Sequence, residues 1–281
     1  MNRISTEKKV AVISALVEGV SVRATSRMTG VAKGTILRLL ADVGTACAEY
    51  QNRTLRGLAC QRVQIDEIWS FCYAKEKTVK ARQIAVPAAG DVWTFVAIEA
   101  QTKLVLGWRV GNRDTASATA FVKDVAGRLA SRIQLTTDGH KMYLEAVEQA
   151  FGAAVDYAML VKLYGAETDG QRQYSPAQCI GARIEPITGA PDRRHVSTSY
   201  IERQNLTMRM NMRRFTRLTN AFSKKLENHI HSIALFYMYY NFARIHQTLR
   251  VTPAMEADVS NHVWELEDII ALTEKRQPLA A

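Results

Sequence analysis

The 281-residue sequence is poor in cysteine, and its four cysteines are scattered without a Cys-x-x-Cys pair. This spacing argues against a disulfide framework or a cysteine zinc site, and it is typical of reduced thiols in a cytoplasmic protein. The most apolar segment, residues 233–242, is too short to span a bilayer. The polar start, MNRISTEKK, is unlike a signal peptide. We therefore expect a cytoplasmic protein that binds no membrane.

Sequence motifs for several common chemistries are also missing. Residues 30–35, GVAKGT, lack the spacing of a phosphate-binding loop, and no Gly-x-Ser-x-Gly elbow occurs. His229 and His231 are two residues apart, a spacing that a helix splays, so they are poor joint metal ligands. These absences argue against nucleotide hydrolysis, a serine nucleophile and an organic cofactor.

Positive charge, by contrast, is abundant. The chain has 37 Lys and Arg against 27 Asp and Glu, which gives a formal net charge of +10. A balance this basic favours nucleic acid as the partner, and less often an anionic membrane surface. We therefore expect DNA or RNA to be bound.

The first 55 residues show the pattern of a helix-turn-helix. Apolar spacing predicts a helix over 7–18, Gly19 ends it, a second short helix closes at Gly30, and a longer one begins near Lys33. We predict a DNA-binding domain over residues 1–55; the alternative is an ordinary helical bundle with a solvated basic face. The side chains expected to contact DNA are Arg23, Arg27, Lys33, Thr35 and Arg38.

From residue 56 to 258 the pattern predicts a second domain of the α/β class. Three apolar strands, a helix, a strand, a helix and a strand imply a mixed sheet with helices on its faces. Residues 165–198 show no period and are predicted to form a long irregular loop. A basic helix should begin at Ser199, followed by a buried apolar helix. Residues 259–281 are predicted to be an acidic helix and tail.

Two acids stand in or at the end of predicted strands. Asp66 lies inside VQIDEIW, where an uncompensated carboxylate costs several kcal/mol, and Asp138 ends a strand in LTTDGH. If these strands are neighbours, the acids face one site, and a bound divalent cation explains why like charges are tolerated. The alternatives are a solvent-facing or Arg-paired acid at 66 and a plain Asp-Gly turn at 138.

Glu202 is the third candidate, because it is the only acid between Arg193 and Lys225. The alternative is a capping box, Ser199-x-x-Glu202, in which the carboxylate serves only its own helix start. Glu67 should point to the opposite face of its strand from Asp66. The weaker alternatives for a third metal ligand are Glu67, Asp91, Glu99 and Glu185.

Oxygen ligands select Mg²⁺ or Mn²⁺ over zinc. Two such ions about 3.5–4 Å apart can activate an attacking oxygen and stabilise a leaving one in phosphoryl transfer. We therefore expect Asp66, Asp138 and Glu202 to bind two Mg²⁺ or Mn²⁺ ions beside DNA held on a basic surface.

Three segments resemble bacterial insertion-sequence transposases, the insertion-sequence-one type in particular. They are TDG at 137–139, STSYIERQNLTMRMNMRRFTRLTNAFSKKLENH at 197–229 and YYNFARIHQTLRVTPAMEA at 239–257. The resemblance covers residues 63–258 and implies a ribonuclease-H-like catalytic domain of the DDE type. Its first acid would be Asp66, its second Asp138 and its third Glu202, the last within I-E-R-x-N.

The resemblance also implies DNA contacts along the helix of the third acid. Asn205 and Arg209 match polar and basic positions near the site, and Arg203, Arg213 and Arg214 are expected to position phosphates. The chain departs from the family in two respects: it lacks the N-terminal zinc-binding cysteines of many members, and its stretch from Asp138 to Glu202 is long.

The sequence thus predicts a transposase that cleaves and joins DNA at insertion-sequence ends. It would bind terminal inverted repeats and target DNA, act as a homo-oligomer on DNA, and lie on the nucleoid when bound. Two other functions stay open: a non-catalytic, sequence-specific DNA-binding regulator, and a ribonuclease-H-like nuclease that cuts without joining.

Overall fold

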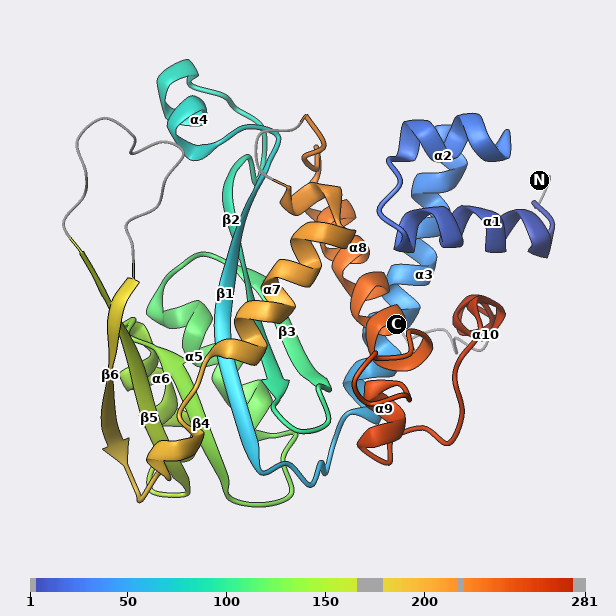
Figure 1. The fold of residues 1–281 in the computed structure, drawn as a ribbon. Coiled ribbons are helices and arrows are strands. Elements are labelled where there is room, and N and C mark those ends of the chain that lie inside the picture. Colours follow the sequence, from blue (N-terminus) through green and yellow to red (C-terminus); the bar gives the residue numbers. More distant parts are fainter. Residues whose placement is uncertain (1–3, 166–178, 217–219, 275–281) are drawn as a thin grey trace, which may run out of the picture.

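The computed structural model describes residues 4–165, 179–216 and 220–274. Three helices come first in the chain, as Figure 1 shows at its upper right. Their bounds are Thr6–Val17 for α1, Val22–Thr29 for α2 and Lys33–Thr54 for α3. Ser21 caps α2, and Gly30, with a positive φ of 69°, ends it. The helices and the Gly30 turn predicted from sequence are therefore present.

A six-stranded mixed sheet follows, with the strand order β3-β2-β1-β4-β5-β6. Its strands are β1 Arg62–Cys72, β2 Gly90–Glu99, β3 Val105–Gly111, β4 Ile133–Asp138, β5 Val155–Tyr164 and β6 Cys179–Thr188. The central pairs β1–β4 and β4–β5 are parallel, while β1–β2, β2–β3 and β5–β6 are antiparallel. This confirms the predicted α/β class with a mixed sheet, and it is consistent with a ribonuclease-H-like fold.

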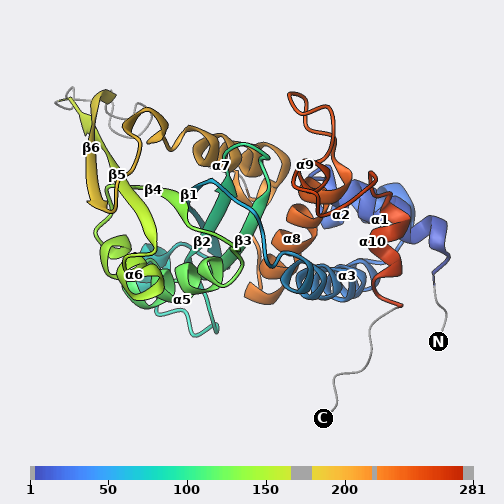
Figure 2. The ribbon, with the colours of Figure 1, turned by 90° about the horizontal axis from the view of Figure 1, so that it is seen from below.

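Helices cover both faces of the sheet (Figures 1 and 2). Helices α5 (Thr115–Ala126) and α6 (Met142–Phe151) lie on one face, and α7 (Ser199–Asn211) and α8 (Leu226–Met238) lie on the other. The shorter elements are α4 Glu76–Arg82, α9 Pro253–Glu256, α10 Leu266–Ala271, the 3₁₀ turns Arg193–His195 and Arg213–Phe215, and the π-helical turn Tyr239–Ala243.

The two-residue period of a strand explains how β2 serves both layers. Phe95 packs against Phe121 of α5, with ring centroids 5.8 Å apart. Its neighbour Val96 points the other way, into a cluster with Met208 of α7 and Tyr237 of α8. Apolar residues at successive positions of β2 are therefore needed, because both of its faces are buried.

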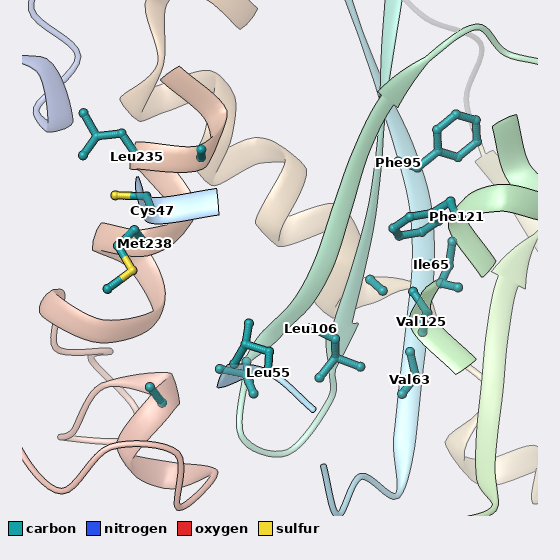
Figure 3. Packing of buried hydrophobic residues seen from close by; sticks show 14 of the residues in the cluster. Cys47, Leu55, Val63, Ile65, Phe95, Leu106, Phe121, Val125, Leu235 and Met238 are labelled. Atoms are coloured by element: carbon teal, nitrogen blue, oxygen red, sulfur yellow. The ribbon is translucent and has the colours of Figure 1, made fainter. Parts of the chain in front are cut away.

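One hydrophobic cluster includes buried residues of both the N-terminal helices and the sheet. Figure 3 shows labelled members of that cluster from Cys47, Leu235 and Met238 through Leu55 and Leu106 to Phe95 and Phe121. The Gln51 side-chain amide of α3 also donates to the Ala234 carbonyl of α8, at 3.1 Å. Helix α3 is thus fixed against α8.

Gly44 allows this close approach of α3 to α8. A Cβ at this position would lie 2.6 Å from the Cβ and 2.7 Å from the Cα of His231. We expect Gly44→Ala to lower the melting temperature, since overpacking costs about 1–3 kcal/mol. Helix propensity alone would instead add about 1 kcal/mol of stability. Gly34→Ala is the matched control, because nothing lies within 4 Å of that added methyl group; its melting temperature should stay equal or rise.

The interval 165–198 differs from its prediction as an irregular loop. Residues 179–188 form β6, which pairs with β5 at the edge of the sheet; residues 166–178 lie outside the described residues. The strand escapes pattern recognition because most of its side chains are exposed and it contains Pro186, which an edge strand tolerates. Helix α4, between β1 and β2, was likewise not predicted. None of the described helices combines the length and apolarity needed to cross a bilayer.

Candidate metal centre

The sheet register brings Asp66 and Asp138 together. In the parallel pair β1–β4, Ile65 lies opposite Thr137, so the next residue on each strand is one of the two acids. Carboxylate oxygens of Asp66, Glu67 and Asp138 all lie within 4.8 Å of one another. Two strands far apart in sequence thus form one acidic cluster, where the sequence predicted a shared site for Asp66 and Asp138.

Asp66 is held by two neutral donors. Its Oδ1 accepts the backbone N–H of Glu67 at 2.8 Å, and its Oδ2 accepts from the side-chain amide of Asn205 on α7 at 2.9 Å. Asp138 accepts the backbone N–H of His140 at 3.0 Å. Within the described parts of the chain, no Lys or Arg forms an ion pair with Asp66 or Asp138. Among the described residues, the alternative in which Asp66 pairs with an arginine is therefore wrong.

Negative charge accumulates in this cluster. Burial raises the pKa of Asp66 to about 7, and the charges of Glu67, Asp138 and, to a smaller extent, Glu202 contribute to the rise. Burial and the charge of Glu67 also raise the pKa of Asp138. Oxygen donors that repel one another in a partly buried site fit a hard divalent cation, which would offset their charge.

Glu67 also contacts the α5–α6 side of the sheet. Its Oε1 accepts from the Arg113 guanidinium at 2.6 Å, and its Oε2 accepts from the Tyr143 hydroxyl of α6 at 2.7 Å. Both oxygens of this buried carboxylate therefore have partners. Glu67 contributes charge to the cluster, while its own charge is balanced by Arg113. No sequence signal singled out Arg113 or Tyr143.

Glu202 stands one turn into α7. Its carboxylate forms an ion pair with Lys162 of β5 at 2.6 Å and accepts from the Thr198 hydroxyl. In a capping box, the Glu202 carboxylate would accept a backbone N–H at the helix start. Among the described residues it contacts the Lys162 and Thr198 side chains instead. Glu202 does not belong to the group of oxygens within 4.8 Å, although its charge raises the pKa of Asp66. Glu202 thus lies close enough to Asp66 for its charge to act on that residue, with its carboxylate turned to Lys162.

Helix α7 is attached to β1 beside these acids. The Gln64 side-chain carbonyl accepts the backbone N–H groups of Tyr200 and Ile201, each at 3.0 Å, which satisfies the first turn of α7. One turn later, Asn205 donates to Asp66. Gln64 and Asp66 are two apart on β1 and face the same side. They fix the position of the helix that carries Glu202.

Three of the four weaker third-ligand candidates are engaged elsewhere. Asp91 accepts the backbone N–H of Glu76, and Glu185 pairs with Arg183 within β6. Glu99 accepts the backbone N–H groups of Gln101 and Thr102 and organises the turn after β2. These three acids serve local structure away from the Asp66 cluster.

The residues predicted to contact DNA differ in exposure. Asn205 is buried and contacts Asp66. The exposed members are Arg23, Arg27, Lys33, Arg38, Arg203 and Arg213, and the half-buried ones are Thr35, Arg209 and Arg214. The structure therefore leaves most of these cations accessible to a ligand.

Sequence comparison identifies no relative: no family model matches the chain, and no curated protein matches it. Among solved structures, the chain is similar to a piggyBac transposase in a cryo-EM synaptic complex with hairpin DNA. The TM-score is 0.42 at 8% identity, and the match covers 96% of this chain and 71% of that chain. A likeness this distant says nothing about which residues act in this chain.

The raised pKa of Asp66 predicts how stability without metal depends on pH. The folded protein holds this proton up to about pH 7, whereas the unfolded chain loses it near 3.8. Ionised Asp66 therefore opposes folding, and this effect grows as pH rises from 4 to 7. In EDTA we expect Asp66→Asn to be more stable than the unsubstituted protein at pH 8, by at most about 4 kcal/mol, given about 1.4 kcal/mol per pKa unit.

Thermal melts from pH 4 to 8 check this expectation. The stability difference should shrink towards zero at the acid end, where Asp66 is protonated in the folded state and pH approaches its unfolded pKa of 3.8. The exposed Asp91→Asn is the control for loss of an acid outside the cluster. An Asp66→Asn protein less stable than the unsubstituted one at pH 8 would contradict the charge repulsion described above.

Proposed function

We propose that the chain is a DDE-type DNA transposase, which cuts a phosphodiester at the ends of an insertion sequence and joins the free 3′-hydroxyl to target DNA. The observation that carries the proposal is the convergence of Asp66 and Asp138 on the neighbouring central strands β1 and β4, beside the helix that bears Glu202. In a basic protein, a partly buried set of oxygen donors suits phosphodiester chemistry.

Asp66, Asp138 and Glu202 are the residues that would hold Mg²⁺ or Mn²⁺. Such a cation, when bound, supplies a Lewis acid for the attacking and leaving oxygens of phosphoryl transfer. Asn205 orients Asp66 by donating to its Oδ2. Glu67 is left out of the proposed ligand set, because its two oxygens already accept from Arg113 and Tyr143 and its charge is balanced by Arg113.

Glu202 must leave Lys162 to join the aspartates. The side chain of Lys162 is about one-third exposed and that of Glu202 is 41% exposed, so neither is locked in place by packing. The pair is therefore a weak one in solvent. Once released, the Lys162 ammonium lies beside the acids, where it can contact a non-bridging phosphate oxygen of the DNA.

Binding of the element ends is proposed for a helix-turn-helix formed by α2 and α3. The left-handed Gly30 separates the two helices, and the exposed Arg23, Arg27, Lys33 and Arg38 line them. Arg203, Arg209 and Arg213 continue the positive charge along and beyond α7. We further propose that two or more copies assemble on DNA, because each element has two ends.

A strand-transfer assay tests the proposal. Labelled duplexes copied from the DNA that flanks the gene are incubated with the protein in Mg²⁺ and, separately, in EDTA. Cleaved and joined products that require Mg²⁺ support a transposase. Cleavage without joining would instead indicate a nuclease, and binding without either reaction would indicate a regulator.

A further inference from the structure

A cleft of about 640 Å³ lies between the N-terminal helices and the α7–α8 side of the core. Residues 16–40 supply one wall, and described residues between 212 and 236 supply the other. The walls meet at Gly19, where a Cβ would collide with the backbone of Asn211 at the end of α7. The cleft is thus bounded by both proposed functional parts of the chain.

All charged side chains among the described residues that line this cleft are cationic. No Asp or Glu occurs among its described lining residues. Its cationic side chains are Arg23, Lys33, Arg213, Arg214 and Lys224. Arg23 and Lys33 come from the N-terminal helices, while the others come from the core. Such a cleft attracts an anion that both walls can contact at once.

Arg214 is the cation built into the cleft wall. Burial lowers the pKa of its guanidinium, and its Nη1 donates to the Ser223 hydroxyl at 2.6 Å. Ser223 is itself fixed by His229, which contacts Ser70 of β1. No carboxylate among the described residues pairs with Arg214. A guanidinium has five N–H donors, so Arg214 has donors to spare for a bound anion.

The start of α3 adds to the positive potential. Its N-cap, Ala32, provides no side-chain hydrogen bond, and no acid occurs in its first turn. The 22-residue helix begins at Lys33, which lines the cleft. Uncapped N–H groups at a helix start carry a partial positive charge and favour phosphate.

The cleft also has an apolar floor, which includes Leu37, Met212 and Phe236. A free inorganic anion gains nothing from this surface, whereas a nucleic-acid strand presents the C–H surface of a sugar between successive phosphates. Cations at the rim and apolar side chains below them therefore fit a sugar–phosphate backbone better than a single ion.

The distance from the acids follows from α7. The helix rises about 14 Å from Glu202 to Asn211 at 1.5 Å per residue. At about 3.4 Å per nucleotide, this corresponds to about four nucleotides. We propose that the cleft binds the backbone of one DNA strand about four nucleotides from the scissile bond, so that the N-terminal helices and the core grip the same strand. The inference rests on the proposed function and adds a site to it.

Salt-dependent binding to labelled element-end DNA in EDTA tests the cleft without catalysis. The double variant Lys33→Gln/Arg213→Gln removes one exposed cation from each wall. We expect its slope of log affinity against log salt to fall by about two, one for each lost phosphate contact. The single variant Arg214→Gln should lower the slope by about one, with a thermal melt to show that it folds. Lys123→Gln, on α5 across the sheet, is the matched control and should leave the slope unchanged.

Trimmed DNA locates the contact. Duplexes are shortened to two nucleotides from the scissile position, on each side in turn, and the unsubstituted protein should lose affinity for one of them. On that duplex the double variant should show no further loss, because the contacted phosphates are gone. Two results would overturn the inference. One is a double variant whose slope of log affinity against log salt is unchanged. The other is a double variant that loses as much affinity for DNA too short to reach the cleft as for full-length DNA. Failure of the unsubstituted protein to bind any element-end DNA would instead remove the proposed function.

Discussion

Asp66→Asn and Asp138→Asn are each expected to abolish Mg²⁺-dependent cleavage and joining of element-end DNA, with losses of at least about a thousandfold. An amide is a neutral ligand, so either change weakens the cation that supplies several kcal/mol of transition-state stabilisation. A loss of about 4 kcal/mol corresponds to about three factors of ten. Initial rates of cleavage and joining, measured separately at saturating Mg²⁺, check both substitutions.

The controls separate chemistry from folding and binding. Asp91→Asn replaces an exposed acid that accepts a backbone N–H of α4, and it should keep its activity. Asp66→Asn should bind DNA in EDTA with an unchanged salt slope, because its carboxylate lies outside the cationic surface. If Asp66→Asn cuts DNA at a rate within tenfold of the unsubstituted protein, the acidic cluster is not the catalytic centre.

Glu67 and Glu202 are expected to respond in opposite ways to substitution by Gln. Glu67→Gln breaks a buried contact with Arg113 and Tyr143, and loss of one partner of a buried pair costs about 3–5 kcal/mol. Because the Arg113 side chain is 37% exposed, we expect a smaller cost of about 2 kcal/mol. The melting temperature should then fall by about 5 °C.

Glu202→Gln should instead keep its stability and lose activity. Its partner Lys162 is accessible to water, so a broken ion pair costs about 1 kcal/mol or less. Loss of a metal ligand should lower strand-transfer rates by at least about a hundredfold. Paired melting curves and rate measurements distinguish the two glutamates. A stable but inactive Glu67→Gln beside an active Glu202→Gln would assign the third ligand to Glu67.

Much of the sheet could be predicted, because the residue composition of its strands is typical of β-strands. The apolar runs around Asp66 and before Asp138 are buried on both faces, and a carboxylate among Val, Ile and Trp is conspicuous in such a run. The order of the strands in the chain does not predict that β1 and β4 are neighbours in the sheet. Their pairing brings two separate acids into one cluster, and the predicted shared site depended on that pairing.

The partners of these acids could not be predicted. Arg113, Tyr143 and Lys162 come from segments that are remote in sequence, and nothing in their local patterns distinguishes them from other polar residues. Asn205 was expected to face DNA, yet it is buried with its amide on Asp66. Side-chain direction on α7 depends on where Gln64 fixes the helix start, which is a tertiary contact.

The same kind of contact explains the strand at 179–188. Its backbone hydrogen bonds to β5 stabilise it, while its side chains, mostly exposed, carry no apolar alternation. An edge strand with a single partner needs little sequence specificity on its outer side.

Helix α3 begins at Lys33 beside the cleft and, further along, packs tightly on α8 at Gly44. When a recognition domain is joined to the rest of a protein by a flexible linker, orienting that domain on its target costs conformational entropy. Such a protein also tolerates variable gaps between the recognised bases and the reacting bond. A continuous rigid helix removes both properties. If the chain acts as proposed, the fold itself would set the interval along the DNA, and inserting or deleting one base pair should rotate the reacting bond away from the acids.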